Sequence, residues 1–259
     1  MTVPWKTVWI IGASSGIGLE LARLMDAGGA NVAVSARSGD VLREVAATGR
    51  SMSAHPVDIA DFAAVAACAT SIEKDVGPID LAVLSAGAWS LMEADQLDMT
   101  AVRHGVMVNY MGAMHALDAL IPRMLARGRG HIAIVASVAG YRGLPRSVAY
   151  GPTKAALINL AETLRTELEP RGIRVSLINP GFVDTPMTRD NPFPMPGLMS
   201  APAAARKILS GLERGRFEIA FPFGFATAMK ILRVMPDAIY FWIIRTFVTK
   251  TGSKRKRPV

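Results

Sequence analysis

The sequence predicts an α/β fold built on a doubly wound parallel sheet, that is, a single Rossmann-type domain. Short β-branched or apolar runs alternate along the chain with alanine-rich stretches of helical length. The apolar runs are continuous, as expected for strands that are covered by helices on both faces of a sheet. A glycine-rich stretch directly follows the first apolar run, where a dinucleotide-binding fold needs one.

The elements follow each other in a regular order. We expect strands in residues 7–12, 31–37, 52–59, 79–87, 130–140 and 173–181, with a further candidate strand in 217–222. We expect helices from near Gly16, through residues 39–48, from Asp61 to about Val76, near residues 100–127, and from Tyr150 onward. Each predicted helix separates two predicted strands, which is the pattern of parallel βαβ units.

The composition is compatible with one domain and a large core. The chain has 259 residues, of which 51% are hydrophobic and 19% charged, so that global disorder is not expected. The single cysteine, Cys68, excludes an internal disulfide and is compatible with a reducing compartment. The N-terminal apolar run is too short for a signal peptide, and we therefore expect a cytoplasmic protein. The four histidines show no paired ligand spacing, which leaves a metal site without support.

We divide the chain into a dinucleotide-binding and catalytic domain, residues 1–224, and an apolar helical extension with a basic tail, residues 225–259. Within the domain, residues 185–215 form the expected substrate-loop region. Its first part, residues 185–200, is rich in proline and methionine and poor in helix formers. Such a segment holds regular structure poorly and is a candidate mobile loop.

The glycine-rich stretch reads IIGASSGIGLELA. Glycines there allow a tight turn and a close approach of the backbone to a pyrophosphate at a helix N-terminus, where unpaired N–H groups and the helix dipole favour an anion. Ordinary turn glycines are the alternative, but the position after the first strand of an alternating pattern favours a dinucleotide site. The residues of this loop that we expect to bind the cofactor are Gly12, Ser14, Ser15, Gly16, Ile17 and Gly18.

The end of the second predicted strand should meet the adenosine ribose. An acidic residue there would bond the ribose 2′-hydroxyl and repel a 2′-phosphate. The chain instead has Ala36 and Arg37 at this place, with no carboxylate before Asp40. A guanidinium suits a phosphate because it is permanently charged and contacts two oxygens at once. We therefore predict NADP(H), bound in part by Arg37, over NAD(H); a solvated arginine at a turn is the alternative.

Four features occur together: the glycine loop, Ser-Ala-Gly at 85–87, Ser137 in the fifth predicted strand, and the pair Tyr150 and Lys154, four residues apart. Ser137 precedes Tyr150 by 13 positions. In this order and at these separations, the features resemble the short-chain dehydrogenase/reductase family, in its compact single-domain form with a Y-x-x-x-K active site. The resemblance covers residues 7 to about 188.

The chemistry of these side chains suits carbonyl reduction. Such a reaction needs a proton at oxygen as hydride reaches carbon, and Tyr150 can supply that proton. A free phenol has a pKa of about 10, and we expect Lys154, one helical turn away, to lower the pKa of Tyr150 by stabilising the phenolate. Ser137 would donate a hydrogen bond to the substrate oxygen. Taken singly, the three residues could be an exposed lysine, a core tyrosine and a turn serine.

The resemblance implies further roles. Lys154 would also hold the nicotinamide ribose, Asn109 would hold a water that links this lysine to solvent, Asp58 would contact the adenine amino group, and Thr185 would bond the nicotinamide carboxamide. A structural asparagine bonded to backbone and a helix N-cap are the alternatives for Asn109 and Asp58. The other residues expected to contact the cofactor are Ala86, Gly87, Tyr150, Pro180, Gly181 and Val183.

Two positions depart from the family pattern. Ile11 stands where the family usually has a threonine, and Ser85 where it usually has an asparagine. In the family, both positions mainly support the sheet and the cofactor loop, so that we expect the departures to affect local stability more than activity. The catalytic set itself is complete.

The net charge of +8 comes in large part from Lys254 to Arg257 at the C-terminus. The rest of the chain shows no basic stripe with interleaved aromatic residues, so that we do not expect nucleic-acid binding. Charged residues and Pro236 interrupt the apolar extension, which excludes a transmembrane span. The extension could cover the substrate pocket, pack against a second subunit, or make peripheral contact with an anionic membrane; packing within the protein or an interface is favoured.

We predict an NADP(H)-dependent oxidoreductase that interconverts a ketone or aldehyde and its alcohol, with an apolar or lipid-like substrate. The resemblance implies a homodimer or homotetramer that pairs through the helices carrying Asn109 and Tyr150. A non-enzymatic NADP(H)-binding sensor is one alternative, although such proteins tend to lose the tyrosine or lysine. An epimerase or dehydratase on the same scaffold is the other.

Overall fold

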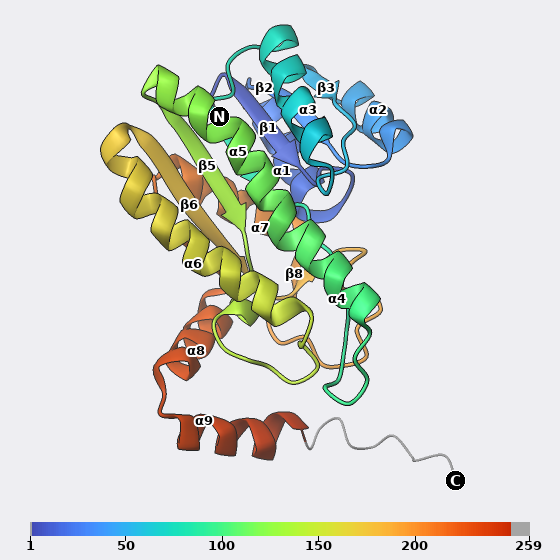
Figure 1. Cartoon of the computed structure of the whole chain (residues 1–259), viewed down its shortest axis with the longest axis vertical. Helices are drawn as coiled ribbons and strands as arrows, with labels where there is room; N and C mark the ends of the chain where they lie inside the picture. The colour runs from blue at the N-terminus through green and yellow to red at the C-terminus, as the bar shows by residue number, and fades with distance from the viewer. Residues whose placement is uncertain (1, 250–259) are drawn as a thin grey trace.

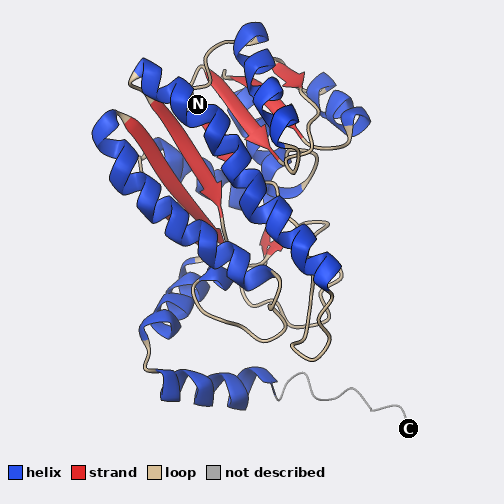
Figure 2. Ribbon diagram, viewed as in Figure 1, coloured by secondary structure: helices blue, strands red, loops and turns tan. Residues whose placement is uncertain are grey.

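The structure, a computed structural model, describes residues 2–249 and centres on a seven-stranded sheet (Figures 1 and 2). All pairings in the sheet are parallel, in the order β3-β2-β1-β4-β5-β6-β9. The strands are β1 (Thr7–Ile11), β2 (Asn31–Ser35), β3 (Met52–Ala54), β4 (Leu81–Leu84), β5 (Gly130–Val135), β6 (Ile173–Pro180) and β9 (Glu218–Phe221). A separate short pair joins β7 (Val183–Asp184) to β8 (Met199–Ser200).

Helices connect the strands and cover both faces of the sheet. They are α1 (Gly16–Ala27), α2 (Gly39–Ala47), α3 (Phe62–Asp75), α4 (Met99–Val106), α5 (Gly112–Arg127), α6 (Tyr150–Leu168), α7 (Ala201–Glu213), α8 (Phe223–Val234) and α9 (Asp237–Ile243). Short 3₁₀ turns occupy Val138–Gly140 and Glu169–Arg171. Helices α3, α5 and α6 pack on one face of the sheet, which is the near face in Figure 1, and α1, α2 and α7 pack on the other.

This arrangement confirms the predicted fold class. All five residues of β1 and all four of β4 are buried, because helices cover these strands on both sides. The buried apolar residues form two clusters, one on each face of the sheet. Strand order reverses at β1, which lies between β2 and β4, and such a switch point places a crevice at the carboxyl ends of the strands.

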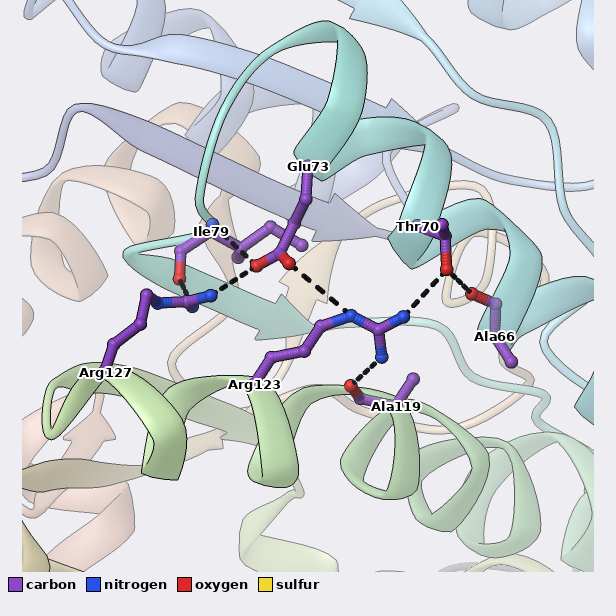
Figure 3. A network of polar contacts seen from close by, with 7 residues as sticks. All are labelled: Ala66, Thr70, Glu73, Ile79, Ala119, Arg123 and Arg127. Atoms are coloured by element: carbon purple, nitrogen blue, oxygen red, sulfur yellow. Dashed lines mark hydrogen bonds and ion pairs between the residues drawn. The ribbon is translucent and has the colours of Figure 1, made fainter.

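A charged network fastens α3 to α5 on the near face (Figure 3). The Glu73 carboxylate accepts a hydrogen bond from Arg127 Nη1 at 2.7 Å and lies 3.5 Å from Arg123 Nε. Arg123 Nη2 also donates to Thr70 Oγ1 at 2.7 Å, and Arg127 Nη2 donates to the Ile79 carbonyl at 3.1 Å. The side chains of Glu73 and Arg127 are less than one quarter exposed. The network therefore sets the spacing between α3 and α5, the two helices that cover the core here.

The helix expected near residues 100–127 is not a regular α-helix throughout. A π-helical turn, Met107–Met111, separates α4 from α5 and contains Asn109. A π turn changes the direction of the side chains that follow it, and such turns are frequent at functional sites. A π-helical turn holds one residue more than an α-helical turn. The sequence does not reveal it, because the spacing of the apolar residues around it is only slightly shifted.

The C-terminal extension forms two helices that meet at Pro236, where a break was predicted. Helix α8 begins at Phe223 and sends Ala226 and Met229 into the core. A π-helical turn, Ile244–Thr249, follows α9. Among residues 2–249, no helix combines the length and the hydropathy that crossing a bilayer requires. Residues 254–257, on which the predicted basic tail depends, lie outside the described residues.

Candidate active site

A cavity of about 450 Å³ lies at the carboxyl ends of the central strands. It runs from Arg37 and Ser38 after β2, past the glycine loop after β1, to Tyr150 and Lys154 on α6. The predicted site residues that line it are Gly12, Ser14, Ser15, Gly16, Ile17, Arg37, Asp58, Ala86, Gly87, Ser137, Tyr150, Lys154, Pro180, Gly181, Val183 and Thr185. Sequence reasoning therefore selected residues that the fold brings to one crevice, although they come from many separate segments.

The glycine loop fits closely against the end of β4. A Cβ atom at Gly12, where φ is +92°, would lie 2.5 Å from the Ala86 nitrogen, and the Gly12 N–H donates to the Ser35 carbonyl at 2.7 Å. Gly18 does not line the cavity; a Cβ atom there would lie 2.1 Å from the Gly12 carbonyl oxygen. Glycine is thus required at both positions for packing, which brings the backbone of three segments together beside the start of α1.

The start of α1 keeps its backbone donors available. Ser15 precedes the helix in an extended conformation, and its hydroxyl makes no capping bond to the first turn. The first N–H groups of a helix have no intrahelical acceptor, and together with the helix dipole they favour an anion. The arrangement fits the pyrophosphate of a dinucleotide, because it combines these donors with a loop whose close approach is enforced by glycine.

At the far end of the cavity, Arg37 is exposed and lines the wall together with Ser38. Its nearest acidic neighbour in sequence, Asp40, instead forms an ion pair with Arg43. Asp58 lines the same end, and its carboxylate accepts a hydrogen bond from the Ala60 N–H at 3.0 Å. The helix N-cap considered for Asp58 belongs to Asp61, which accepts from the Ala64 N–H at 2.9 Å.

Tyr150 and Lys154 lie on the first turn of α6, at the other end of the cavity. The Lys154 ammonium donates to the Val135 carbonyl at 3.0 Å and lies 5.5 Å from the centre of the Tyr150 ring. Ser137, just after β5, caps the short 3₁₀ turn by accepting from the Ala139 N–H at 3.1 Å, and its hydroxyl donates to the Pro180 carbonyl at 3.4 Å. The three side chains therefore surround one end of the crevice.

The expected lowering of the Tyr150 pKa by Lys154 is wrong for the polypeptide alone. Burial raises the pKa of Tyr150 from 10.0 to about 12, although part of the side chain reaches the cavity surface, and a hydrogen bond with Ser137 opposes this rise. Burial also lowers the pKa of Lys154 from 10.5 to about 8. Desolvation is the main cause of both pKa shifts, and the Lys154 ammonium points to the Val135 carbonyl and lies beside the Tyr150 ring.

Asn109 is buried behind this end of the cavity and does not line it. Its Oδ1 accepts from the Ala88 N–H at 2.7 Å, and its Nδ2 donates to the Ala88 carbonyl and to Thr153 Oγ1, both at 3.0 Å. These bonds match the alternative of a structural asparagine. They tie the π-helical turn to the segment after β4 and to α6, close to Gly87, where a Cβ atom would lie 3.7 Å from Lys154 Nζ.

Thr185 and Gly181 close the cavity from the side of β6. A Cβ atom at Gly16, where φ is +58°, would lie 2.9 Å from Thr185 Cγ2, so that this threonine faces the glycine loop. The Thr185 N–H donates to Thr188 Oγ1 at 3.2 Å. At Gly181 the tight contact is with Phe225 of α8, because a Cβ atom would lie 2.9 Å from its ring. Glycine is therefore needed there to admit the C-terminal extension, in addition to any approach to a cofactor.

Sequence reasoning missed several residues of the site. Trp89 packs edge-on against Tyr150, with ring centres 4.8 Å apart, and the sequence signal for it is only that it follows Gly87 by two positions. Trp89 itself does not line the cavity. Two missed lining residues, His104 and Thr188, are polar but belong to none of the motifs. The other missed lining residues have no chemical signature in the sequence, because they are apolar or small. They include Ser38, Val57, Ile59, Ala88, Val108, Pro186 and Met187.

Comparison with known proteins identifies the family of the chain. The family described as short chain dehydrogenase matches residues 6–193. An uncharacterized oxidoreductase of Myxococcus xanthus is 34% identical over 91% of this chain and 95% of its own length. The 3-dehydrosphinganine reductase TSC10B of Arabidopsis thaliana is 32% identical over 97% of this chain and 81% of its own length.

Solved structures agree in fold. A short chain dehydrogenase from Burkholderia cenocepacia, in complex with NADP, has a TM-score of 0.82 and 26% identity, and the match covers 94% of this chain and 99% of that one. A short-chain dehydrogenase from Streptomyces avermitilis has a TM-score of 0.80 at 24% identity, over 96% and 99% of the two chains, and shares the fold. On its sequence, fold and site geometry, the chain belongs to the short-chain dehydrogenase/reductase family of oxidoreductases.

Proposed function

We propose that this protein is an NADP(H)-dependent oxidoreductase that interconverts a ketone or aldehyde and its alcohol, and that its substrate is apolar or lipid-like. One observation carries the proposal. A single cavity joins a glycine-loop anion site and an exposed arginine at one end to Ser137, Tyr150 and Lys154 at the other. A dinucleotide lying along the carboxyl edge would bring its nicotinamide to the end where the proton donor lies.

The preference for NADP(H) rests on the end of β2. Arg37 lies in the cavity wall, and Asp40, the first carboxylate after it, is occupied by Arg43. A guanidinium there favours a 2′-phosphate by charge and by bonds to two oxygens. The Burkholderia cenocepacia relative, whose structure contains NADP, supports the same choice. Asp58, Ala86, Gly87, Pro180, Gly181, Val183 and Thr185 are the further residues that we propose to contact the cofactor.

In the proposed reduction, the bound nicotinamide supplies hydride to the carbonyl carbon. Tyr150 protonates the carbonyl oxygen, since its high pKa keeps the phenol protonated at neutral pH. Ser137 donates a hydrogen bond to the same oxygen as negative charge gathers there. Lys154 holds the ribose and replenishes the proton of Tyr150, and Asn109 positions Lys154 by fixing Ala88 and Thr153 around it.

An apolar substrate is supported by the lining and by one relative. Val108, Pro186 and Met187 line the cavity, and Trp89 packs on Tyr150. The name of the Arabidopsis thaliana relative describes the reduction of 3-dehydrosphinganine, a ketone with a long alkyl chain. The match to it extends over 97% of this chain, so that it includes residues of the C-terminal extension.

We infer a homodimer or homotetramer that pairs through the helices around Asn109 and Tyr150. Val106 at the end of α4 is 41% exposed, and Met107 and Met111 at the two ends of the π-helical turn are 42% and 36% exposed. A run of apolar side chains on one helical segment is typical of an interface. Sedimentation equilibrium of the wild type and of Met107→Asp tests this inference, and the charged variant should shift toward the monomer.

The function is tested by NADPH oxidation with a panel of long-chain ketones and aldehydes, for the wild type and for Tyr150→Phe. The wild type should turn over at least one ketone, and Tyr150→Phe should lose about 10²–10⁴-fold in kcat, as expected for removal of a general acid. The Kd for NADPH, measured by fluorescence titration, should change far less than kcat, because Tyr150→Phe keeps the aromatic ring and removes only the hydroxyl. Equal rates in the two proteins would exclude Tyr150 as the acid, and tight NADPH binding without turnover of any carbonyl would indicate a sensor.

A further inference from the structure

Helices α8 and α9 present apolar side chains to solvent. In α8, Phe223, Ile231 and Val234 are 84%, 54% and 82% exposed, and they recur at helical spacing on the side opposite the buried Met229. In α9, the exposed residues surround the buried Tyr240. We call these exposed residues the apolar face, and its members are Phe223, Ile231, Val234, Ile239, Phe241 and Trp242.

The same part of the chain carries nearly all of the net charge. Residues 223–259 contain eight lysines and arginines and one aspartate, a formal charge of +7 out of the +8 of the whole chain. Lys230 and Arg233 are exposed on α8, where Lys230 pairs with Glu218 and Arg233 lies 3.8 Å from Glu162. Five of the eight cations, Lys250 and residues 254–257, follow the described residues. We refer to 254–257 as the basic cluster.

This combination distinguishes between possible occupants of the apolar face. Two copies of the chain that met through it would bring segments of +7 together, and like charges across an interface oppose association. An anionic bilayer takes up both components, because its acyl boundary accepts the apolar side chains and its headgroups attract the cations. Charge therefore favours a lipid surface over a second copy.

The apolar face is fixed at the end of the molecule where the site lies. Figure 1 shows α8 and α9 beyond the carboxyl ends of the strands, the edge that also forms the cavity. Arg142 Nη1 donates to the Leu232 carbonyl at 2.8 Å, Arg142 also pairs with Asp237, and its guanidinium lies 4.0 Å from the Tyr240 ring centre. Arg142 belongs to the connection between Ser137 and Tyr150, so that the extension is fastened to the segment joining two site residues.

We propose that the apolar face and the basic cluster dock this protein on an anionic lipid bilayer, with the carboxyl edge of the sheet turned toward the membrane. Phe223, Phe241 and Trp242 enter the boundary between headgroups and acyl chains, and the cations lie at the headgroups. In this orientation a membrane-resident ketone reaches the cavity without crossing bulk water. That last step rests on the proposed function, whereas docking itself does not.

Co-sedimentation of the full chain with vesicles tests the docking. The protein should sediment with vesicles of phosphatidylglycerol and phosphatidylcholine, and far less with vesicles of phosphatidylcholine alone. Raising the ionic strength from about 0.1 M to about 1 M should release most of it, since this shortens the Debye length from about 10 Å to about 3 Å. Far-ultraviolet circular dichroism of the unbound protein shows that it is folded, whether or not the proposed function holds.

Matched variants separate the contribution of the apolar face to membrane binding from that of the basic cluster. Phe241→Ser should weaken binding to anionic vesicles at least about fivefold, because it removes apolar area from the acyl boundary. Phe62→Ser on α3 should not, although the wild-type phenylalanine there is 53% exposed against 51% for Phe241. Replacing the basic cluster by four alanines should weaken binding at least about tenfold, as each cation near an anionic surface contributes to attraction. The control removes four exposed cations from the opposite end of the molecule, namely Arg50, Lys74, Arg129 and Arg171.

Three outcomes would overturn the proposal. The first is a full chain that stays in the supernatant with anionic vesicles at low ionic strength. The second is equal loss of binding in the basic-cluster variant and its control, which would indicate attraction by net charge alone. The third is a shift of Phe241→Ser to a smaller oligomer in the absence of lipid, which would assign the apolar face to contact between copies.

Discussion

The indole of Trp89 meets the phenol of Tyr150 edge-on, with ring centres 4.8 Å apart and planes at 89°. Trp89 Nε1 also donates to Asn191 Oδ1 at 3.1 Å. Tyr150, the candidate acid, therefore packs against Trp89, and Trp89 is bonded in turn to the segment between β7 and β8. Edge-to-face aromatic pairs contribute about 0.5–1.5 kcal/mol beyond the area they bury. The orientation of Tyr150 thus depends on a residue outside the Y-x-x-x-K motif.

We expect Trp89→Ala to lower kcat/KM for carbonyl reduction by about tenfold, which corresponds to the upper part of that range. The Kd for NADPH should not change, because Trp89 contacts Tyr150 and is not among the residues that line the cavity. Trp89→Phe keeps an aromatic edge and should retain most of the rate. Steady-state kinetics of the two variants provide the measurement, and an unchanged kcat/KM in Trp89→Ala would contradict the positioning role.

The pH dependence of carbonyl reduction should follow the protonation of the Lys154 amine. Its pKa is lowered to about 8 by burial, so that the ammonium is present below this pH and is lost above it. We therefore expect kcat/KM to fall as pH rises through about 8, while Tyr150, with a pKa of about 12, remains protonated. A pH profile of kcat/KM measures this, and a profile that is flat up to pH of about 10 would show that the lysine charge is not required.

The same shift affects stability in a defined direction. Between pH 8 and 10.5 the unfolded chain keeps the Lys154 proton that the folded chain has lost. Because the unfolded state then binds more protons, the contribution of Lys154 to the free energy of unfolding rises with pH over this window. Lys154→Met should remove this rise in urea unfolding curves. The reverse slope, or an identical slope in the variant, would contradict the assigned pKa shift.

Replacing Arg37 tests the choice of nucleotide. Arg37→Asp should raise the Kd for NADPH by about thirtyfold, since a charged hydrogen bond contributes about 1.5–3 kcal/mol and the new carboxylate repels the 2′-phosphate. The Kd for NADH should stay the same or decrease, because an acidic residue can bond the 2′-hydroxyl. Arg50→Asp, at an exposed position outside the cavity lining, is the control for charge. Equal weakening of NADPH and NADH would place Arg37 outside the 2′-phosphate site.

Arg142 should hold the C-terminal helices in place. Arg142→Ala removes its bonds to the Leu232 and Met235 carbonyls and its pair with Asp237. We expect at least about tenfold faster proteolysis between α8 and α9, because each bond to a charged donor contributes about 1.5–3 kcal/mol.

The control for this prediction is Arg146→Ala. Arg146 lies in the same connection, but its guanidinium pairs with Glu93, 2.9 Å away. Limited proteolysis with chymotrypsin, followed by mass spectrometry, locates the cuts. Trypsin is avoided because the variants themselves remove an arginine. If the two variants are cleaved at the same rate, Arg142 does not fasten the extension.

The elements of the fold were predictable where one local pattern decided each of them. The strands near Thr7 and Leu81 are continuously buried apolar runs because helices cover both faces of the sheet. The site could be outlined for a related reason. Parallel strands bring their carboxyl ends to one edge, so that motifs far apart in sequence, such as the glycine loop and Tyr150, line the same cavity.

What the sequence did not reveal depends on contacts between distant segments. Trp89 carries no motif, and its contact with Tyr150 arises from packing. The π-helical turn at Asn109 adds a residue without a visible change of period. The pKa of Tyr150 was expected to fall because the sequence shows Lys154 one turn away. It rises because the phenol is buried, which a local pattern does not report. The contacts of Arg142 with α8 and α9 are likewise long-range.

The central claim is that hydride passes to a carbonyl carbon at the end of the cavity formed by Ser137, Tyr150 and Lys154. Its most direct test uses NADPH deuterated at the nicotinamide C4, a long-chain ketone that the protein turns over, and mass spectrometry of the alcohol formed. We predict one deuterium on the carbinol carbon of the product with the wild type, and at least about a hundredfold less labelled product with Tyr150→Phe at the same bound NADPH. An alcohol without deuterium, or equal labelled product from the two proteins, would contradict the account.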